Sequence, residues 1–336
     1  QVAQLTADPG HDDGPVVGEQ VAGGSALIDR SLAPGDGDGD LGGHVDSSGG
    51  QVGFGRTSRL CKPNGVSRPN RPPRPQAVLT VLSSEWISPS TVRLVAGGEG
   101  FSVLNLNEFT DAYVKLVFVK PELGLTPPYD EAALREQLAP EDLPVRRTYT
   151  LRWVDRVNEQ VAIDFVVHGD EGIAAPWARA AQPGDRFVAS GAGGAYAPDP
   201  AADWHLFIGD ESALPAIAAA LEALPADARG LAYLQVGEES GRYEITGPHG
   251  IHQQWITGGG DQSSLLSEAV AAGPWPEGRV QVFAHGEREA MKAVRAVLKE
   301  REVPREDLSL SGYWAFGRTE DRFQAEKREP IGQILV

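Results

Sequence analysis

The pattern of apolar residues changes once along this chain of 336 residues, near position 200. From residue 76 to about 194, short alternating or β-branched runs are separated by turn-forming residues, which is typical of strands. We place these strands at 77–82, 91–95, 112–119, 147–154, 160–168 and 185–191. Six short strands at this spacing predict a small antiparallel barrel.

After residue 202 the pattern predicts strands that alternate with helices. The three strand and helix pairs lie at 205–209 and 214–224, 230–236 and 263–272, and 279–284 and 287–301. Such units imply a parallel sheet, whose binding sites lie at the carboxyl ends of its strands. We therefore expect a β-barrel domain over 76–200 and an α/β domain over 201–336, with the functional crevice facing the barrel.

Residues 1–75 carry no helical or strand period over a useful length. The first 55 are rich in Gly, Asp and Ser, and residues 56–75 are basic and crowded with proline. We interpret this segment as a disordered arm and a Pro/Arg-rich linker. Attraction of the basic part to nucleic acid or a membrane is the alternative interpretation. Because the chain begins with Gln, its sequence leaves open whether the arm is native.

Composition excludes several classes of protein. The formal net charge of −17 argues against a nucleic-acid partner. A single cysteine, Cys61, excludes a cysteine-ligated iron–sulfur cluster, and no histidines stand at metal-binding spacing, so no protein metal site is expected. The chain has neither a long apolar run nor a signal peptide, so we expect no stable membrane insertion and a cytoplasmic location.

The residues 147–152 place a cation and an aromatic ring on one face of a strand. Alternation puts Arg147 and Tyr149 on the same side, with Thr150 on the other. A flavin uses both groups, since an aromatic ring covers its apolar rings and an arginine balances its diphosphate. A plain amphipathic strand with exposed arginines is the alternative.

A helix start follows the next strand. Gly172, Ala174 and Ala175 precede or open a helical stretch, and Pro176 suits its first turn. Free backbone N–H groups at such a start could bind a diphosphate. An ordinary strand-to-helix turn is the alternative.

Six segments together resemble the siderophore-interacting protein family. They are 147–152, 164–169, Trp177-Ala178, 183–185, 209–217 and Gly312-Tyr313-Trp314. The resemblance covers essentially residues 76–336. It implies a fold like that of ferredoxin reductases, with a six-stranded flavin-binding barrel followed by a nicotinamide-type α/β domain.

The resemblance also implies FAD as the cofactor and NAD(P)H as a possible electron donor. The FAD-binding residues that it implies, together with the aromatic residue expected to close over the flavin, are Arg147, Tyr149, Thr150, Val166, Val167, His168, Gly172, Ala174, Ala175 and Trp314. Two positions depart from the family: Ile173 stands where proline is usual, and Ala175 where a hydroxyl could bond a phosphate. We therefore expect FAD to bind with a hydroxyl contact fewer.

The segment Gly209-Asp210-Glu211-Ser212 follows a strand and opens a helix, where α/β domains receive a dinucleotide. It lacks a GxGxxG motif, and its acids would oppose a phosphate, so the nicotinamide role rests on the resemblance. A simple turn whose acids suit the helix dipole is the alternative.

Four basic residues near the C-terminus are candidates for binding a ferric-siderophore complex: Arg318, Arg322, Lys327 and Arg328. A solvated helix face is the alternative.

These features predict FAD-dependent reduction of a ferric siderophore, with release of ferrous iron and with electrons from NAD(P)H or ferredoxin. No catalytic residue is assigned, because electron transfer needs no side-chain acid or base. The alternatives are a flavin reductase with another acceptor and a non-catalytic siderophore-binding module. The siderophore, the donor and the oligomeric state stay open.

Overall fold

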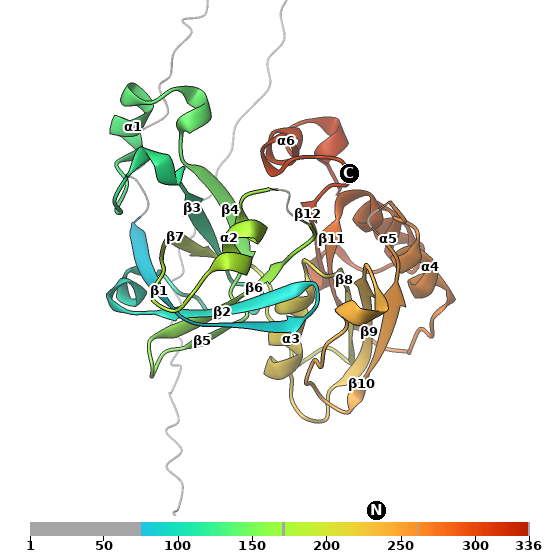
Figure 1. Cartoon of the computed structure of the whole chain (residues 1–336). Coiled ribbons are helices and arrows are strands. Elements are labelled where there is room, and N and C mark those ends of the chain that lie inside the picture. The colour runs from blue at the N-terminus through green and yellow to red at the C-terminus, as the bar shows by residue number, and fades with distance from the viewer. Residues whose placement is uncertain (1–74, 170–171, 260, 335–336) are drawn as a thin grey trace, which may run out of the picture. The chain divides into compact units, whose positions relative to one another are not determined.

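The computed structural model describes residues 75–169, 172–259 and 261–334 of the chain (Figure 1). The prediction of a disordered arm over 1–75 lies, apart from Pro75, outside these residues. Residues 75–334 carry two sheets, each built from consecutive strands.

Seven antiparallel strands of the described residues form the first sheet, in the order β4-β3-β7-β1-β2-β6-β5. Their bounds are β1 Gln76–Ser88, β2 Thr91–Gly97, β3 Tyr113–Phe118, β4 Val145–Thr150, β5 Trp153–Asp155, β6 Gln160–Val166 and β7 Arg186–Gly193. Alternation puts one face of each strand into a common core, where Leu79, Leu94 and Ile163 are buried. The predicted antiparallel barrel is therefore confirmed.

The barrel has one strand more than expected, because the predicted strand 147–154 breaks at Leu151 and Arg152. The backbone N–H of Leu151 donates to the carbonyl of Ala112 at 2.7 Å, on the β3 side. The N–H of Arg152 donates to the carbonyl of Ala162 on β6, at 2.8 Å. The break thus joins the two ends of the sheet, since β4 and β5 are its outer strands.

Two α-helices accompany the barrel, α1 Glu131–Gln137 and α2 Ala174–Ala180. Trp177 of α2 packs edge-on against Phe118 and Phe187, with ring centroids 5.6 and 5.4 Å apart. The helix predicted after residue 172 therefore packs on the barrel core through its tryptophan.

Five strands of the described residues form the second, parallel sheet, in the order β10-β9-β8-β11-β12. Their bounds are β8 Trp204–Asp210, β9 Arg229–Val236, β10 Gly250–Thr257, β11 Val280–Glu287 and β12 Leu308–Trp314. The helices of this half are α3 Leu214–Ala223, α4 Leu265–Ala272, α5 Arg288–Glu300 and α6 Glu320–Glu326. The predicted α/β architecture is confirmed.

Two strands of this sheet were not expected, β10 and β12, and both lie at its edges. Residues 250–252 belong to β10, and Gly312-Tyr313-Trp314, one of the segments on which the family resemblance rests, ends β12. Polar residues interrupt the apolar pattern of β10 at His252, Gln253 and Gln254, and glycine interrupts that of β12 at Gly312.

Helix α3 lies against the barrel. Leu214, Ile217 and Leu221 are among its buried residues, and its Glu222 accepts a hydrogen bond from Arg152 at 2.8 Å. The short 3₁₀ helices in the described connections are η1 Glu99–Val103, η2 Pro121–Leu123, η3 Pro140–Asp142, η4 Glu239–Gly241, η5 Arg305–Asp307 and η6 Pro330–Gly332.

The carboxyl ends of β8, β9, β11 and β12 contribute residues to the lining of one cavity, which also has a wall on the barrel.

Candidate functional site

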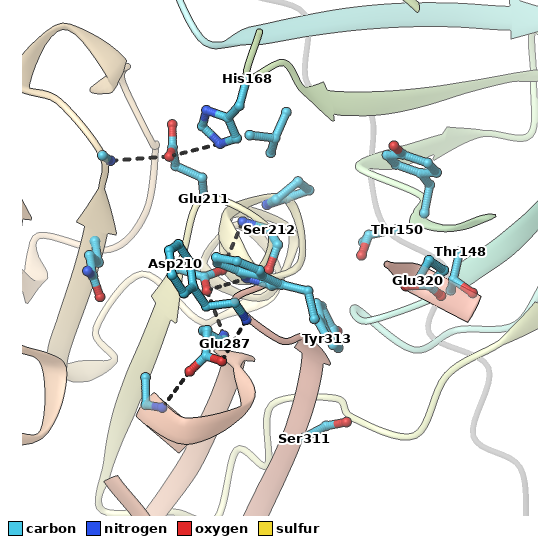
Figure 2. Close-up of a pocket in the computed structure, with 18 of the residues that line it drawn as sticks. Thr148, Thr150, His168, Asp210, Glu211, Ser212, Glu287, Ser311, Tyr313 and Glu320 are labelled. Carbon is cyan, nitrogen blue, oxygen red and sulfur yellow. Dashed lines mark hydrogen bonds and ion pairs between the residues drawn. The ribbon is translucent and has the colours of Figure 1, made fainter. Parts of the chain in front are cut away.

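A cavity of about 900 Å³ lies between the barrel and the carboxyl ends of the parallel strands (Figure 2). Its barrel wall is formed by Tyr113, Lys115, Arg147, Thr148, Tyr149, Thr150, Asp164, Val166 and His168. Its other walls include Asp210, Glu211, Ser212, Gln235, Glu287, Tyr313, Trp314, Glu320, Gln324 and Lys327. A space of this size can enclose a large organic ligand.

Strand β4 turns one cation and one aromatic ring toward this cavity. Tyr149 packs against Phe165 with ring centroids 4.4 Å apart, and burial raises the pKa of its hydroxyl. Arg147 donates to the carbonyl of Arg146 at 2.8 Å and lies 3.3 Å from Asp321. Arg146, one residue earlier and outside the cavity lining, pairs with Glu131. Period-2 alternation therefore sorts the two arginines onto different faces.

Tyr313 links the end of β12 to the barrel. Burial raises the pKa of its hydroxyl, and a hydrogen bond with Thr150 opposes that shift. The ring of His285 lies 4.9 Å from that of Tyr313, and burial lowers the pKa of His285 to about 3. Thr150 and Tyr313 thus meet on the cavity wall, although Tyr313 was not among the predicted site residues.

Asp210, at the end of β8, is surrounded by four donors. One oxygen accepts from the backbone N–H and the hydroxyl of Ser212, at 3.0 and 2.5 Å. The other accepts from the backbone N–H of Glu287 at 2.7 Å and from the indole N–H of Trp314 at 2.8 Å (Figure 2). Burial raises the pKa of Asp210, and these donors oppose that shift. This carboxylate organises the cavity wall and holds Trp314 in place.

Glu211 joins the parallel sheet to the barrel. One oxygen accepts from the hydroxyl of Ser90 at 2.6 Å. The other accepts from the backbone N–H of Gly237 at 3.2 Å and lies 3.5 Å from Nε2 of His168 (Figure 2). Both acids of the predicted nicotinamide segment are therefore engaged within the protein.

Glu287 is a cavity residue that the sequence did not indicate. Its carboxylate caps α5 by accepting from the N–H groups of Glu289 and Ala290, at 2.6 and 2.8 Å. Its second oxygen accepts from the N–H of Phe316 at 3.1 Å, which fixes the turn after β12. An acid just before a helical stretch is a capping signal that could have identified it.

The cations on the cavity wall are Lys115, Arg147 and Lys327. Lys115 donates to the hydroxyl of Thr148 at 3.3 Å, and the ammonium of Lys327 lies 4.5 Å from the ring centre of Phe323. Desolvation lowers the pKa of Lys327; Glu320 opposes this, and Lys115 adds to it. The same lining carries five acids, Asp164, Asp210, Glu211, Glu287 and Glu320, of which Asp210, Glu211 and Glu287 already accept hydrogen bonds from protein N–H groups.

Of the four predicted substrate residues, the cavity contains only Lys327. Arg318 and Arg322 instead donate to Glu326, at 2.9 and 2.8 Å, and Arg328 is exposed after α6. The sequence could not show this, because nothing marked Glu326 as a buried carboxylate.

The remaining predicted residues are not part of the cavity lining. Val167 is buried in the barrel core, and Gly172, Ala174 and Ala175 lie at the start of α2, which no described side chain caps. Gly209 lies behind the wall, where an added Cβ would come within 2.7 Å of Ala213. Gly209 is therefore required for packing of α3 onto β8.

Two further observations concern only the residues that the structure describes. No cluster of three or more His, Cys, Asp or Glu side chains there could hold a metal ion. None of the described helices is both long and apolar enough to cross a bilayer.

Comparisons with known proteins match both halves of the described chain. Residues 80–196 match the siderophore-interacting FAD-binding domain family, and residues 202–317 match the siderophore-interacting protein family. An uncharacterized protein of Mycobacterium tuberculosis is 42% identical over 272 residues, which span 76% of this chain and 96% of the relative. The ferric vibriobactin reductase ViuB of Vibrio cholerae is 30% identical, over 74% of this chain and 93% of its own.

A solved structure is also similar. The siderophore utilization protein from T. fusca has a TM-score of 0.64 and 34% identity, over 73% of this chain and 94% of its own.

Proposed function

This chain belongs to the siderophore-interacting protein family, as its motifs predicted, and on that premise we propose that it is an FAD-dependent reductase of ferric siderophores. The observation that carries the proposal is the meeting of Arg147, Tyr149 and Thr150 in one cavity with the carboxyl ends of the parallel strands. The names of relatives such as the ferric vibriobactin reductase support the same activity.

The residues present fit FAD. The cavity of about 900 Å³ has an aromatic ring, Tyr149, beside a cation, Arg147. The present partner of Arg147 is Asp321, whose side chain is 72% exposed, so a phosphate could replace it at little cost. Tyr149, Thr150, Val166 and His168 would hold the flavin, and Arg147 together with the backbone at the start of α2 would hold the diphosphate. Bound FAD accepts two electrons as a hydride and passes them on singly.

The start of α2 offers backbone donors but no hydroxyl. Ala174 and Ala175 open this helix, and Ile173 precedes it. Because Ala175 replaces a hydroxyl side chain, FAD would have one hydrogen bond fewer, which costs about 0.5 to 1.5 kcal/mol. Arg147 would then contribute much of the specificity for the diphosphate.

The cations of the cavity suit an anionic iron complex. Lys115 and Lys327 line the cavity together with Arg147, so negatively charged oxygen ligands would be attracted there. Siderophores hold ferric iron by hard oxygen ligands, and one electron per iron weakens that hold. The protein's own work is to bind and orient the complex, since electron transfer requires no proton at a side chain.

The electron donor in this proposal is NAD(P)H or ferredoxin. Asp210 is saturated by four donors and Glu211 by contacts to Ser90 and Gly237, so neither carboxylate needs a ligand. Ser212 and Gln235 offer polar groups on the same wall for a nicotinamide.

The test is the visible absorption spectrum of the purified full-length protein, before and after anaerobic addition of NADH or NADPH. Flavin bands that bleach would support the reductase with a nicotinamide donor, and bands that persist would indicate a ferredoxin-type donor. A colourless protein that added FAD does not restore would contradict the flavoenzyme and favour a siderophore-binding module.

A further inference from the structure

Glu326, in the last turn of α6, is a buried carboxylate that binds three arginines. It accepts from Arg288 at 2.6 Å, from Arg318 at 2.9 Å and from Arg322 at 2.8 Å. Only 1% of its side chain is exposed. The Arg288 hydrogen bond, followed by those from Arg322 and Arg318, lowers the pKa of Glu326 to about 2 against the opposing effect of burial. Glu326 is therefore ionised at neutral pH.

The three arginines come from three places in the chain. Arg288 begins α5 and is itself 4% exposed, Arg318 lies in the turn after β12, and Arg322 lies in α6. Glu326 thus ties the C-terminal helix and its entry turn to the start of α5. Without it, three like charges would face one another and Arg288 would lose its buried partner.

Helix α6 is held firmly on the α5 side and weakly on the barrel side. On the α5 side, Lys292 also donates to the carbonyl of Ile331 at 2.8 Å. On the barrel side, Asp321 forms an ion pair with Arg147 at 3.3 Å, and the Asp321 side chain is 72% exposed. The position of α6 over the cavity therefore depends mainly on its attachment to α5.

The cavity side of α6 carries Lys327. This residue follows Glu326, and its ammonium lies over the ring of Phe323, one helical turn earlier and buried. Because Phe323 and Glu326 both pack away from solvent, the orientation of the last helical turn fixes where the ammonium of Lys327 lies.

We propose that Glu326 is a positioning residue for the iron complex: by binding Arg288, Arg318 and Arg322, it holds α6 so that Lys327 faces the cavity. This inference rests on the proposed function, because it takes the ligand of Lys327 to be an anionic iron chelate. A purely structural clamp would instead affect stability and FAD retention, with no special link to Lys327.

The experiment measures binding of gallium citrate, a redox-inert anionic stand-in for a ferric chelate, to full-length FAD-loaded protein by calorimetry. The variants are Glu326→Gln, Lys327→Met, the double variant, and Glu329→Gln as a matched control. Glu329 is exposed just after α6, and its side chain makes no hydrogen bond or ion pair with the described residues. Reduction of ferric citrate is measured on the same samples.

Lys327→Met should weaken gallium citrate binding about tenfold, as expected for the loss of one charge-assisted contact. Glu326→Gln should weaken it by a similar factor, and the double variant by no more than the larger single effect, because one group acts through the other. Glu329→Gln should bind like the wild type. Additive effects of about 100-fold in the double variant, or unchanged binding by Glu326→Gln, would overturn the proposal.

If Glu326→Gln does not fold, Arg322→Met serves instead. The Arg322 side chain is largely exposed, and its replacement removes one of the three arginines that bind Glu326. It should weaken binding about threefold, in the direction of Lys327→Met, and wild-type affinity would overturn the proposal. Failure of the wild-type protein to bind gallium citrate would also overturn the proposal. Normal gallium binding without any ferric citrate reduction would contradict the proposed function alone.

Discussion

The substitution Arg147→Gln tests which face of β4 binds the cofactor. Arg147 lines the cavity, whereas Arg146 lies outside its lining and pairs with Glu131. In the free protein Arg147 contacts an exposed carboxylate, Asp321, and a pair of this kind is worth about 0 to 1 kcal/mol. A charge-assisted bond to a phosphate contributes about 1.5 to 3 kcal/mol. The difference is about 0.5 to 3 kcal/mol, so Arg147→Gln should weaken FAD binding about 2- to 150-fold.

The assay is titration of the flavin-free protein with FAD, followed by quenching of flavin fluorescence. Arg146→Gln is the matched control and should bind FAD like the wild type. Riboflavin, which lacks the diphosphate, should bind both variants equally well. An equal loss of FAD affinity in the two variants, or an Arg147→Gln protein with normal affinity, would refute the assignment of β4 to the cofactor site.

Three further predictions concern the cavity wall and its support. In Asp210→Asn, the amide should turn its NH₂ toward Ser212 and lose one backbone donor, lowering the free energy of unfolding by about 1.5 to 3 kcal/mol; an unchanged urea midpoint would contradict this. In Gly193→Ala, the added Cβ would lie 2.3 Å from the ring of Tyr113, so that ring should move and FAD affinity should fall; normal FAD titration would contradict it. The pKa of Glu326 in the folded protein, about 2, lies below its ordinary value of 4.5. The contribution of ionised Glu326 to the free energy of unfolding is therefore complete above pH 4.5 and is lost as the pH falls toward 2. Glu326→Gln should remove part of the acid dependence of the melting temperature, and identical slopes in the two proteins would contradict this.

The fold could be predicted where one face of an element is buried. Alternation identified the barrel strands, and the switch to helical periods identified the α/β half. The break at Leu151 and Arg152 was not visible, because the alternation continues through it and only hydrogen bonds to Ala112 and Ala162 reveal it. The edge strands β10 and β12 lacked a strong apolar pattern, because His252, Gln253 and Gln254 interrupt the first and Gly312 interrupts the second.

The candidate site could be predicted only where its residues share one strand. Arg147 and Tyr149 followed from a period of two, but Lys115 did not, because a lysine in a strand usually indicates solvent. Its position depends on pairing with β4, where Lys115 lies opposite Thr148. Pairing between strands far apart in sequence is set by the fold, so no local pattern contains it.

The roles of the acids depended even more on tertiary contacts. The sequence suggested that Asp210 and Glu211 would oppose a phosphate. In the structure, Asp210 is saturated by donors from Ser212, Glu287 and Trp314, which lie on three different segments. A charge in a sequence motif therefore says little about the field in a cavity until its partners are known.

The most direct test of the account is an anaerobic reaction of the photoreduced, FAD-loaded protein with a ferric siderophore in the presence of a ferrous-ion chelator. The account predicts that the flavin absorption returns while roughly two ferrous ions are trapped per flavin, since a two-electron donor serves one-electron acceptors. A flavin that stays reduced while the ferric complex remains bound and intact would contradict it.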